Sequence, residues 1–276
     1  MENDTEYQRT TRNSVNRLKN RAKYDYETVH SIIDAAPVVH VSFLPTSIED
    51  DPFPTILPML GCTGTYPSND NSDVSIYLHG HAASRFFKLS AQNEDEGPYG
   101  LVRGPNGSIP VCVAATLIDG IVLAVTPFNH SNNYRSVVVH GYASIVSDPG
   151  EKMWALDRIT NNVLTDRWDN SRVPPTEAEM KATGVIRVEI VSASAKVRAG
   201  TNGDDRADVV WNAARPEGEK IWTGVVPMWT RYGTPVPGPE NEMKGVPEHI
   251  EKFVQEKNKE GERYASSAAA LLPPKK

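Results

Sequence analysis

The apolar residues of this chain recur mostly with a period of two, which is typical of β-strands. Short runs of β-branched and other apolar residues are separated by segments rich in glycine, proline and aspartate. The dipeptide Asp119-Gly120 predicts a tight hairpin turn between two of these runs. The predicted strands are residues 38–44, 55–60, 74–78, 111–117, 121–126, 135–146 and 185–198.

Helical spacing, with apolar residues three and four positions apart, occurs in fewer places. Val29, Ile32 and Ile33 share one face of a helix predicted over residues 26–36. Asp148 or its neighbour would cap another helix that ends near residue 164. The other predicted helices are residues 84–92, a segment opening at Pro174-Pro175-Thr176 where Thr176 and Glu179 would form a capping box, and residues 247–263.

The order of these elements predicts the fold class and the domain organisation. Strands dominate and do not alternate regularly with helices, which argues against a doubly wound parallel sheet. We therefore predict a mainly β (α+β) fold, an antiparallel β-barrel of about six strands with peripheral helices. Residues 1–25 would form a polar arm and residues 26–230 the barrel domain. Residues 231–276 would be a C-terminal extension, linker-like at 231–245, partly helical, and disordered from Ala265 onward.

Composition excludes several classes of function. The 276 residues carry a net charge of −6 without a long Lys/Arg run, so we expect no nucleic-acid partner. No window approaches the roughly 18 apolar residues that a membrane helix needs. The first residues are acidic and lack the apolar run of a secretory signal, so we expect a cytoplasmic protein. Cys62 and Cys112 are predicted to be reduced, buried thiols, and no metal site is predicted.

One candidate site lies where the third predicted strand meets a short helix. The segment 78–89 reads Leu-His-Gly-His-Ala-Ala-Ser-Arg-Phe-Phe-Lys-Leu, so a glycine-containing turn leads into a helix near Ser84. A helix N-terminus offers unpaired N–H groups. Ser84 adds a hydroxyl group and Arg85 a guanidinium fork that matches phosphate oxygens, with Lys88 one turn further on. The segment predicts a phosphate site, although an ordinary capped surface helix would carry the same residues.

Two further groups of cations lie near strand ends. Arg135 and Ser136 open a long β-branched strand, where they would face an anion or form an ordinary ion pair. Lys196 and Arg198 are two positions apart and share a strand face. Trp222 follows and would either stack on an aromatic ligand or belong to the core.

In order and spacing, these motifs resemble the pyridoxamine 5′-phosphate oxidase-like superfamily of FMN-binding split barrels over about residues 20–230. They look closest to its flavin-nucleotide-binding branch, which is related to 5-nitroimidazole reductases. The turn at Ser84-Arg85 looks like the family's phosphate-binding turn. The strand 135–141, Arg-Ser-Val-Val-Val-His-Gly, resembles the R-Q-V-R-I-E-G strand of the oxidases.

The resemblance implies FMN as cofactor and a homodimer in which the partner supplies residues from the 196–222 region. The phosphate would be held by Ser84, Arg85 and Arg135, and the flavin ring would lie against the strand 56–59 and near Thr116. The cofactor-binding residues predicted from the motifs and the resemblance are Ile56, Leu57, Pro58, Met59, Ser84, Arg85, Lys88, Thr116, Arg135, Ser136, Lys196, Arg198 and Trp222.

The function predicted is that of an FMN-dependent oxidoreductase acting on a small organic substrate. His81 or Tyr134 would relay a proton. The oxidases end in an R-L-x-P-type motif, whereas this chain has Val225-Val226-Pro227-Met228, which argues against pyridoxamine phosphate as substrate. An NAD(P)H donor would have to dock transiently, because no G-x-G-x-x-G motif is present.

Two alternatives stay open. The chain could be a flavin or haem carrier without turnover, with one of four histidines as an axial haem ligand. It could also be a diverged member of the family that uses the barrel for non-redox chemistry. The four histidines are His79, His81, His130 and His140.

Overall fold

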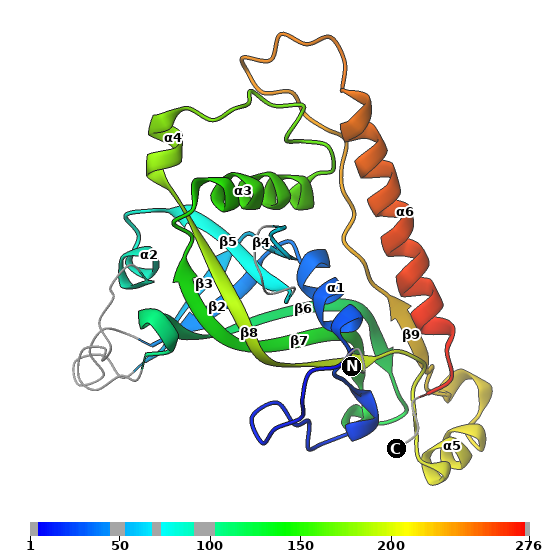
Figure 1. The fold of residues 1–276 in the computed structure, drawn as a ribbon. Helices are drawn as coiled ribbons and strands as arrows, with labels where there is room; N and C mark the ends of the chain where they lie inside the picture. Colours follow the sequence, from blue (N-terminus) through cyan, green and yellow to red (C-terminus); the bar gives the residue numbers. More distant parts are fainter. Residues whose placement is uncertain (1–4, 45–52, 68–72, 91–102, 274–276) are drawn as a thin grey trace. The chain divides into compact units, whose positions relative to one another are not determined.

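The computed structural model describes residues 5–44, 53–67, 73–90 and 103–273, and Figure 1 labels its helices and strands. The strands are β1 (Ala22–Lys23), β2 (Val39–Phe43), β3 (Thr55–Met59), β4 (Gly61–Gly64), β5 (Ser75–His81), β6 (Ile109–Leu123), β7 (Ser131–Ile145), β8 (Thr183–Arg198) and β9 (Gly224–Pro227). The α-helices are α1 (Tyr26–Ala35), α2 (Arg85–Ser90), α3 (Pro149–Val163), α4 (Glu177–Ala182), α5 (Arg206–Ala213) and α6 (Glu248–Ala270). Single 3₁₀ turns lie at Lys19–Arg21, Pro105–Gly107, Pro127–Asn129 and Glu217–Glu219.

The strands form one sheet of nine strands in the order β3-β2-β6-β7-β8-β5-β4, with β1 beside β8 and β9 beside β6. The pairs β2–β3, β2–β6, β4–β5, β5–β8 and β6–β9 are antiparallel. This arrangement confirms the predicted antiparallel α+β split-barrel class. It differs from the prediction in having nine strands, and within the described residues its hydrogen-bonded path stays open.

The chain divides into two compact units, and the boundary between them falls within β6, β7 and β8. The first unit comprises residues 1–14, 23–115 and 137–195, and the second comprises residues 15–22, 116–136 and 196–276.

In the first unit, helices cover one end of the strands (Figure 1). Helix α3 packs against β4 and β5, and α1 packs against β4. One core cluster holds Tyr77, Ala155, Ile159 and Val185 together with the buried thiol of Cys62. Burial raises the pKa of the Cys62 thiol to about 12, so this cysteine stays protonated.

Capping residues start the helices of the first unit where the sequence predicts. The Asp148 side chain accepts a hydrogen bond from the Glu151 N–H at the start of α3. The predicted capping box of α4 is confirmed, because Thr176 and Glu179 satisfy each other's backbone N–H groups. Both caps are hydrogen bonds between residues three positions apart, so they fix the helix starts without any contact from the core.

The predicted hairpin at Asp119-Gly120 is wrong, because β6 runs straight through both residues. Gly120 is not among the glycines with positive φ, so no primed turn forms here. Instead, β9 pairs with β6 at this point, and a Cβ atom on Gly120 would lie 2.9 Å from the Val225 Cγ1. The Asp119 carboxylate is buried in an ion pair with Arg135. Gly120 thus allows β9 to approach β6 closely, and Asp119 forms a salt bridge with Arg135.

In the second unit, α6 lies beside β9 (Figure 1). The disorder predicted from Ala265 onward is wrong as far as residue 270, because α6 continues to Ala270. The side chains of Ala265 and Ala268 are buried, and the Ala268 carbonyl accepts a hydrogen bond of 2.8 Å from the Gly200 N–H. The alanine-rich segment looks like low complexity in the sequence, but its small side chains allow this face of the helix to pack closely against the chain at Gly200. No described helix is both long and apolar enough to cross a bilayer.

Candidate functional site

The predicted phosphate-binding turn joins β5 to α2 in the first unit. The Ser84 N–H donates to the His81 carbonyl at 2.9 Å, and the Lys88 N–H donates to the Ser84 carbonyl at 3.0 Å. Helix α2 has only six residues, so its macrodipole is weak. An anion held here would therefore depend on side-chain charges.

The two cations of α2 face solvent on a firmly anchored helix. Phe86 and Phe87 are buried beneath it, and Phe86 stacks on Phe43 with ring centroids 4.6 Å apart. Arg85 and Lys88 are exposed, and neither has an ion pair in the described part of the chain. The aromatic residues fix the helix, which leaves both cations available to a ligand.

The predicted flavin strand, β3, alternates in exposure. Ile56 is 59% exposed and Met59 is buried, while Leu57 is half-buried and Pro58 is exposed. Ile56 pairs with Ser42 across β2, so its side chain lies on the outer face of the sheet. This face gives an apolar surface to a ligand or a partner.

The predicted site residue Arg135 belongs to the second unit and is fully engaged there. Its Nε and Nη2 atoms donate to the two Asp119 carboxylate oxygens at 3.0 and 2.7 Å. The guanidinium carbon also lies 3.8 Å from the centre of the Tyr264 ring, in a cation–π contact. The neighbouring Ser136 hydroxyl donates to the Lys196 carbonyl at 3.2 Å. The charge of Arg135 is balanced within the protein.

Arg198 is also used structurally. Its side chain is buried and donates to the Asn133 side chain and to the carbonyls of Gly200 and Thr201. These contacts hold the chain where β8 ends. Lys196, two positions earlier, is half-buried.

The remaining predicted residues of the second unit are more open. Trp222 is 63% exposed and lies over Gly224, so it does not belong to the core. Thr116 is exposed and Tyr134 is half-buried. An exposed indole is available for stacking on a ligand or on another chain.

The four candidate histidines have different surroundings. The His81 Nδ1 accepts from the Ala83 N–H at 3.1 Å, and the His130 Nδ1 accepts from the Ala124 N–H at 3.0 Å. Burial lowers the pKa of His79, and burial together with the charge of Arg12 lowers the pKa of His140. Both of these rings are therefore favoured in the neutral form at pH 7. Among the described residues, no group of three or more His, Cys, Asp or Glu side chains could hold a metal ion.

His79 lines a pocket of about 360 Å³ on the α3–α4 side of the first unit. Leu156, Trp168 and Met180 provide apolar walls. The ion pair between Arg172 and Glu179 lies at its edge, with two contacts of 2.5 and 2.6 Å. The pocket offers a neutral imidazole in a largely apolar setting.

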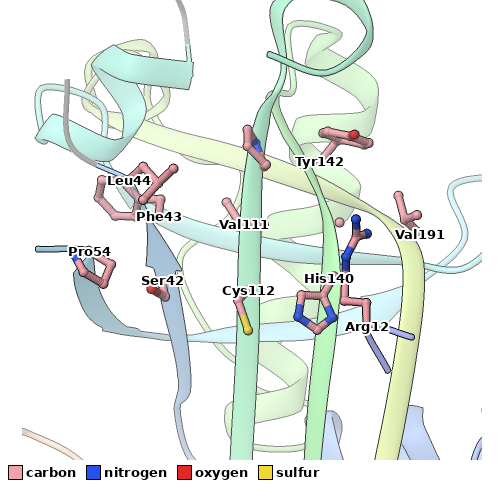
Figure 2. Close-up of a pocket in the computed structure, with 12 residues that line it drawn as sticks. Arg12, Ser42, Phe43, Leu44, Pro54, Val111, Cys112, His140, Tyr142 and Val191 are labelled. Atoms are coloured by element: carbon pink, nitrogen blue, oxygen red, sulfur yellow. The ribbon is translucent and has the colours of Figure 1, made fainter. Parts of the chain in front are cut away.

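A second pocket, of about 350 Å³, lies on the outer face of the first unit, and Figure 2 shows its lining. Of its lining residues, only His140 is among the candidates predicted from the sequence, so sequence reasoning missed this pocket. The available signal was the row of polar residues at the outward positions of β2, β6 and β7. The lining includes Arg12, Ser42, Cys112, His140, Tyr142 and Val191.

The open antiparallel sheet with its covering helices defines a split-barrel protein. The family described as pyridoxamine 5′-phosphate oxidase matches residues 25–197, and this chain belongs to that family. The matched segment includes the β5–α2 turn and ends before Arg198.

Two solved structures have a similar fold. The flavocytochrome Anf3 from Azotobacter vinelandii is 30% identical, with a TM-score of 0.67 over 88% of this chain and 97% of that chain. The FAD and heme binding protein from Mycobacterium smegmatis is 22% identical, with a TM-score of 0.65 over 85% of this chain and 97% of that chain. A comparison with curated proteins finds no match.

Proposed function

We propose that this chain is an FMN-dependent oxidoreductase that acts on a small organic substrate. Bound flavin would supply the hydride or electron transfer. Membership of the family supports the proposal, as does the 30% identity to a protein named as a flavocytochrome. The observation that carries the proposal is the pair of exposed cations on α2, Arg85 and Lys88, which have no ion pair among the described residues. They stand out because the chain as a whole has a net charge of −6.

Arg85 and Lys88 are three positions apart on α2 and so project to one side of the helix. The guanidinium fork of Arg85 matches two phosphate oxygens, and Lys88 adds a point charge. Ser84 contributes a hydroxyl donor beside them. A terminal phosphate monoester concentrates nearly two negative charges on the oxygens of one phosphorus, whereas the diphosphate of FAD spreads two charges over two phosphorus atoms. A compact group of two cations and one hydroxyl therefore suits FMN. Because Arg135 already pairs with Asp119, we assign the phosphate to Ser84, Arg85 and Lys88.

His81 suits the role of proton donor. Its Nδ1 accepts a hydrogen bond, which leaves the proton of the neutral ring on Nε2. The side chain is exposed at the same turn as Ser84. Tyr134 is the second candidate for this role. NAD(P)H would reduce the flavin by docking transiently.

A homodimer is part of the proposal. In the second unit, Val209, Val210 and Trp211 are at least half exposed on α5, and Trp222 is 63% exposed. A monomer rarely leaves so many large apolar side chains in water. We propose that a second copy of this chain covers them. Sedimentation should show a dimer that Val210→Glu dissociates, whereas a wild-type monomer would contradict this part of the proposal.

The identity of the cofactor is tested by the absorption spectrum of the purified protein after separate incubation with FMN, FAD and haem. Flavin bands with preference for FMN are expected, followed by bleaching with NAD(P)H under anaerobic conditions. Stable flavin bands that NAD(P)H leaves unchanged would favour a carrier. Failure to bind any flavin would favour non-redox chemistry in the same barrel.

Haem is the second candidate cofactor, and His79 is the observation that favours it. Its half-buried, neutral ring lines a largely apolar pocket, as an axial ligand requires. The two similar structures named above are a flavocytochrome and a FAD and heme binding protein. If haem binds, a Soret band should appear that His79→Ala abolishes and the exposed-residue control His40→Ala retains. Equal bands in both variants would exclude His79 as ligand.

A further inference from the structure

The pocket of about 350 Å³ on the outer face is lined by residues of four strands, β2, β6, β7 and β8. Ser42 pairs with Cys112 across β2 and β6, and His140 lies on β7 (Figure 2). On these strands the residues on either side of each polar position are buried, so the polar positions all point to the outer face. The pocket floor is therefore a continuous face of the sheet rather than a gap between loops.

Several polar groups of this pocket lack a protein partner in the described part of the chain. The His140 Nδ1 is buried and makes no hydrogen bond. The hydroxyl groups of Ser42 and Tyr142 make none either, and Arg12 has neither a hydrogen bond nor an ion pair. Buried polar groups are normally hydrogen-bonded, so the His140 Nδ1 favours a ligand that can pair with it. The half-buried hydroxyl groups and the exposed guanidinium group are available to the same ligand.

The N-terminal arm holds Arg12 at this pocket. The adjacent Asn13 is 3% exposed, and its Nδ2 donates to the Ala193 carbonyl of β8 at 3.0 Å. The Asn13 Oδ1 accepts from the Thr10 N–H at 2.7 Å, which closes the turn that contains Arg12. The arginine is thus placed at the pocket by a buried hydrogen-bond anchor, while its own side chain stays exposed.

The electrostatic character of the pocket is one-sided. Arg12 is its charged lining residue, and no Asp or Glu of the described chain lines it, although the chain as a whole is acidic. Burial raises the pKa of the Cys112 thiol, so Cys112 adds a neutral wall beside Val111 and Val191. The volume equals that of about a dozen water molecules at roughly 30 Å³ each.

We propose that this pocket binds a small aromatic or aliphatic monocarboxylic acid of about a dozen non-hydrogen atoms. Arg12 holds the carboxylate beside His140, Ser42 and Tyr142 offer hydrogen bonds elsewhere along the pocket, and the apolar walls receive the hydrocarbon. The site is separate from the α2 cations, and the proposal does not depend on the flavin.

The test is calorimetric titration of the full chain, as purified, with 3-phenylpropionate and with the neutral 3-phenylpropionamide. The wild-type protein should bind the acid more tightly than the amide. Arg12→Gln should weaken the acid about tenfold or more, as loss of a charge-assisted hydrogen bond requires, and leave the amide unchanged. Arg17→Gln, at another exposed arginine of the arm, is the matched control and should bind the acid normally.

A second variant tests the pocket itself. Val191 is 52% exposed, so Val191→Phe fills the pocket without disturbing the core. This variant should lose both probes while keeping the wild-type unfolding midpoint. The proposal is overturned if neither probe saturates the wild-type protein at millimolar concentration. It is also overturned if Arg12→Gln binds the acid as tightly as Arg17→Gln does.

Discussion

Arginine has opposite roles in two regions of this molecule. On α2, Arg85 is exposed without an ion pair among the described residues, and the phenyl rings beneath it fix its helix. In the second unit, Arg135 and Arg198 are tied to Asp119, Asn133 and nearby carbonyls. The sequence motifs are alike, since each arginine is predicted to lie at the end of a strand or beside one. What separates them is whether the fold brings an acceptor within reach.

The largest expected effect is on stability, and it comes from breaking the ion pair between Asp119 and Arg135 in the second unit. Asp119→Ala should lower the free energy of unfolding by about 3 kcal/mol, because Arg135 would keep its charge in a partly buried place without a partner. Urea unfolding monitored by circular dichroism measures this loss. The double variant Asp119→Ala/Arg135→Met should be more stable than the single one. A single variant as stable as wild type would show that the ion pair is not a structural link.

Substitution of the exposed Arg85 on α2 should change ligand binding rather than stability. Arg85→Ala should weaken FMN by about 1.5–3 kcal/mol, since a charge-assisted contact is lost. Its unfolding free energy should stay within about 0.5 kcal/mol of wild type, as for other surface substitutions. Fluorescence titration with FMN gives the affinity. An unchanged affinity would remove Arg85 from the proposed site. A large loss of stability would show that Arg85 has a structural role, like Arg135.

Salt sharpens the same contrast. FMN affinity should fall as sodium chloride rises from about 0.05 to about 0.5 M, because exposed cations are screened over roughly a Debye length. The partly buried Asp119–Arg135 pair should respond less, so the unfolding free energy should change little. Titrations at both salt concentrations test this. Salt-independent binding of FMN would mean that a buried site, not the α2 cations, holds the phosphate.

The smallest expected effect is a pH dependence from His79. Burial lowers its pKa below the ordinary 6.5, so the unfolded chain binds a proton more readily than the folded one. Stability from this group is therefore complete above about pH 6.5 and declines as the pH falls below that value. His79→Gln should flatten the decline between about pH 7.5 and 5.5 in urea unfolding. The opposite slope would mean that a carboxylate stabilises the charged ring.

Local signals in the sequence are reliable where neighbours along the chain decide the structure. Thr176 and Glu179 form their capping box because all its atoms lie within one turn. Asp119-Gly120 misleads because its surroundings come from β9 and β7, which no local pattern contains. Ala265 misleads for the same reason, since low complexity and a close-packed helix face use the same small residues.

The candidate site divides in the same way. Ser84, Arg85 and Lys88 lie within a few residues of one another, so their meeting could be predicted. The outer-face pocket needs residues from the arm and from four strands, and their register decides it. The ion pair between Arg135 and Asp119 likewise depends on tertiary structure, which strand periodicity does not predict.

The turn that carries Arg12 is hydrogen-bonded to β8 through the Asn13 side chain. A protease that trimmed the chain ahead of Ser14 would remove Asn13 and Arg12 together without cutting any α-helix of the described residues. If the outer-face pocket binds acids as proposed, such a shortened protein should lose its preference for the acid over the amide. Preparations of this protein should therefore be checked for their intact mass before any ligand is screened.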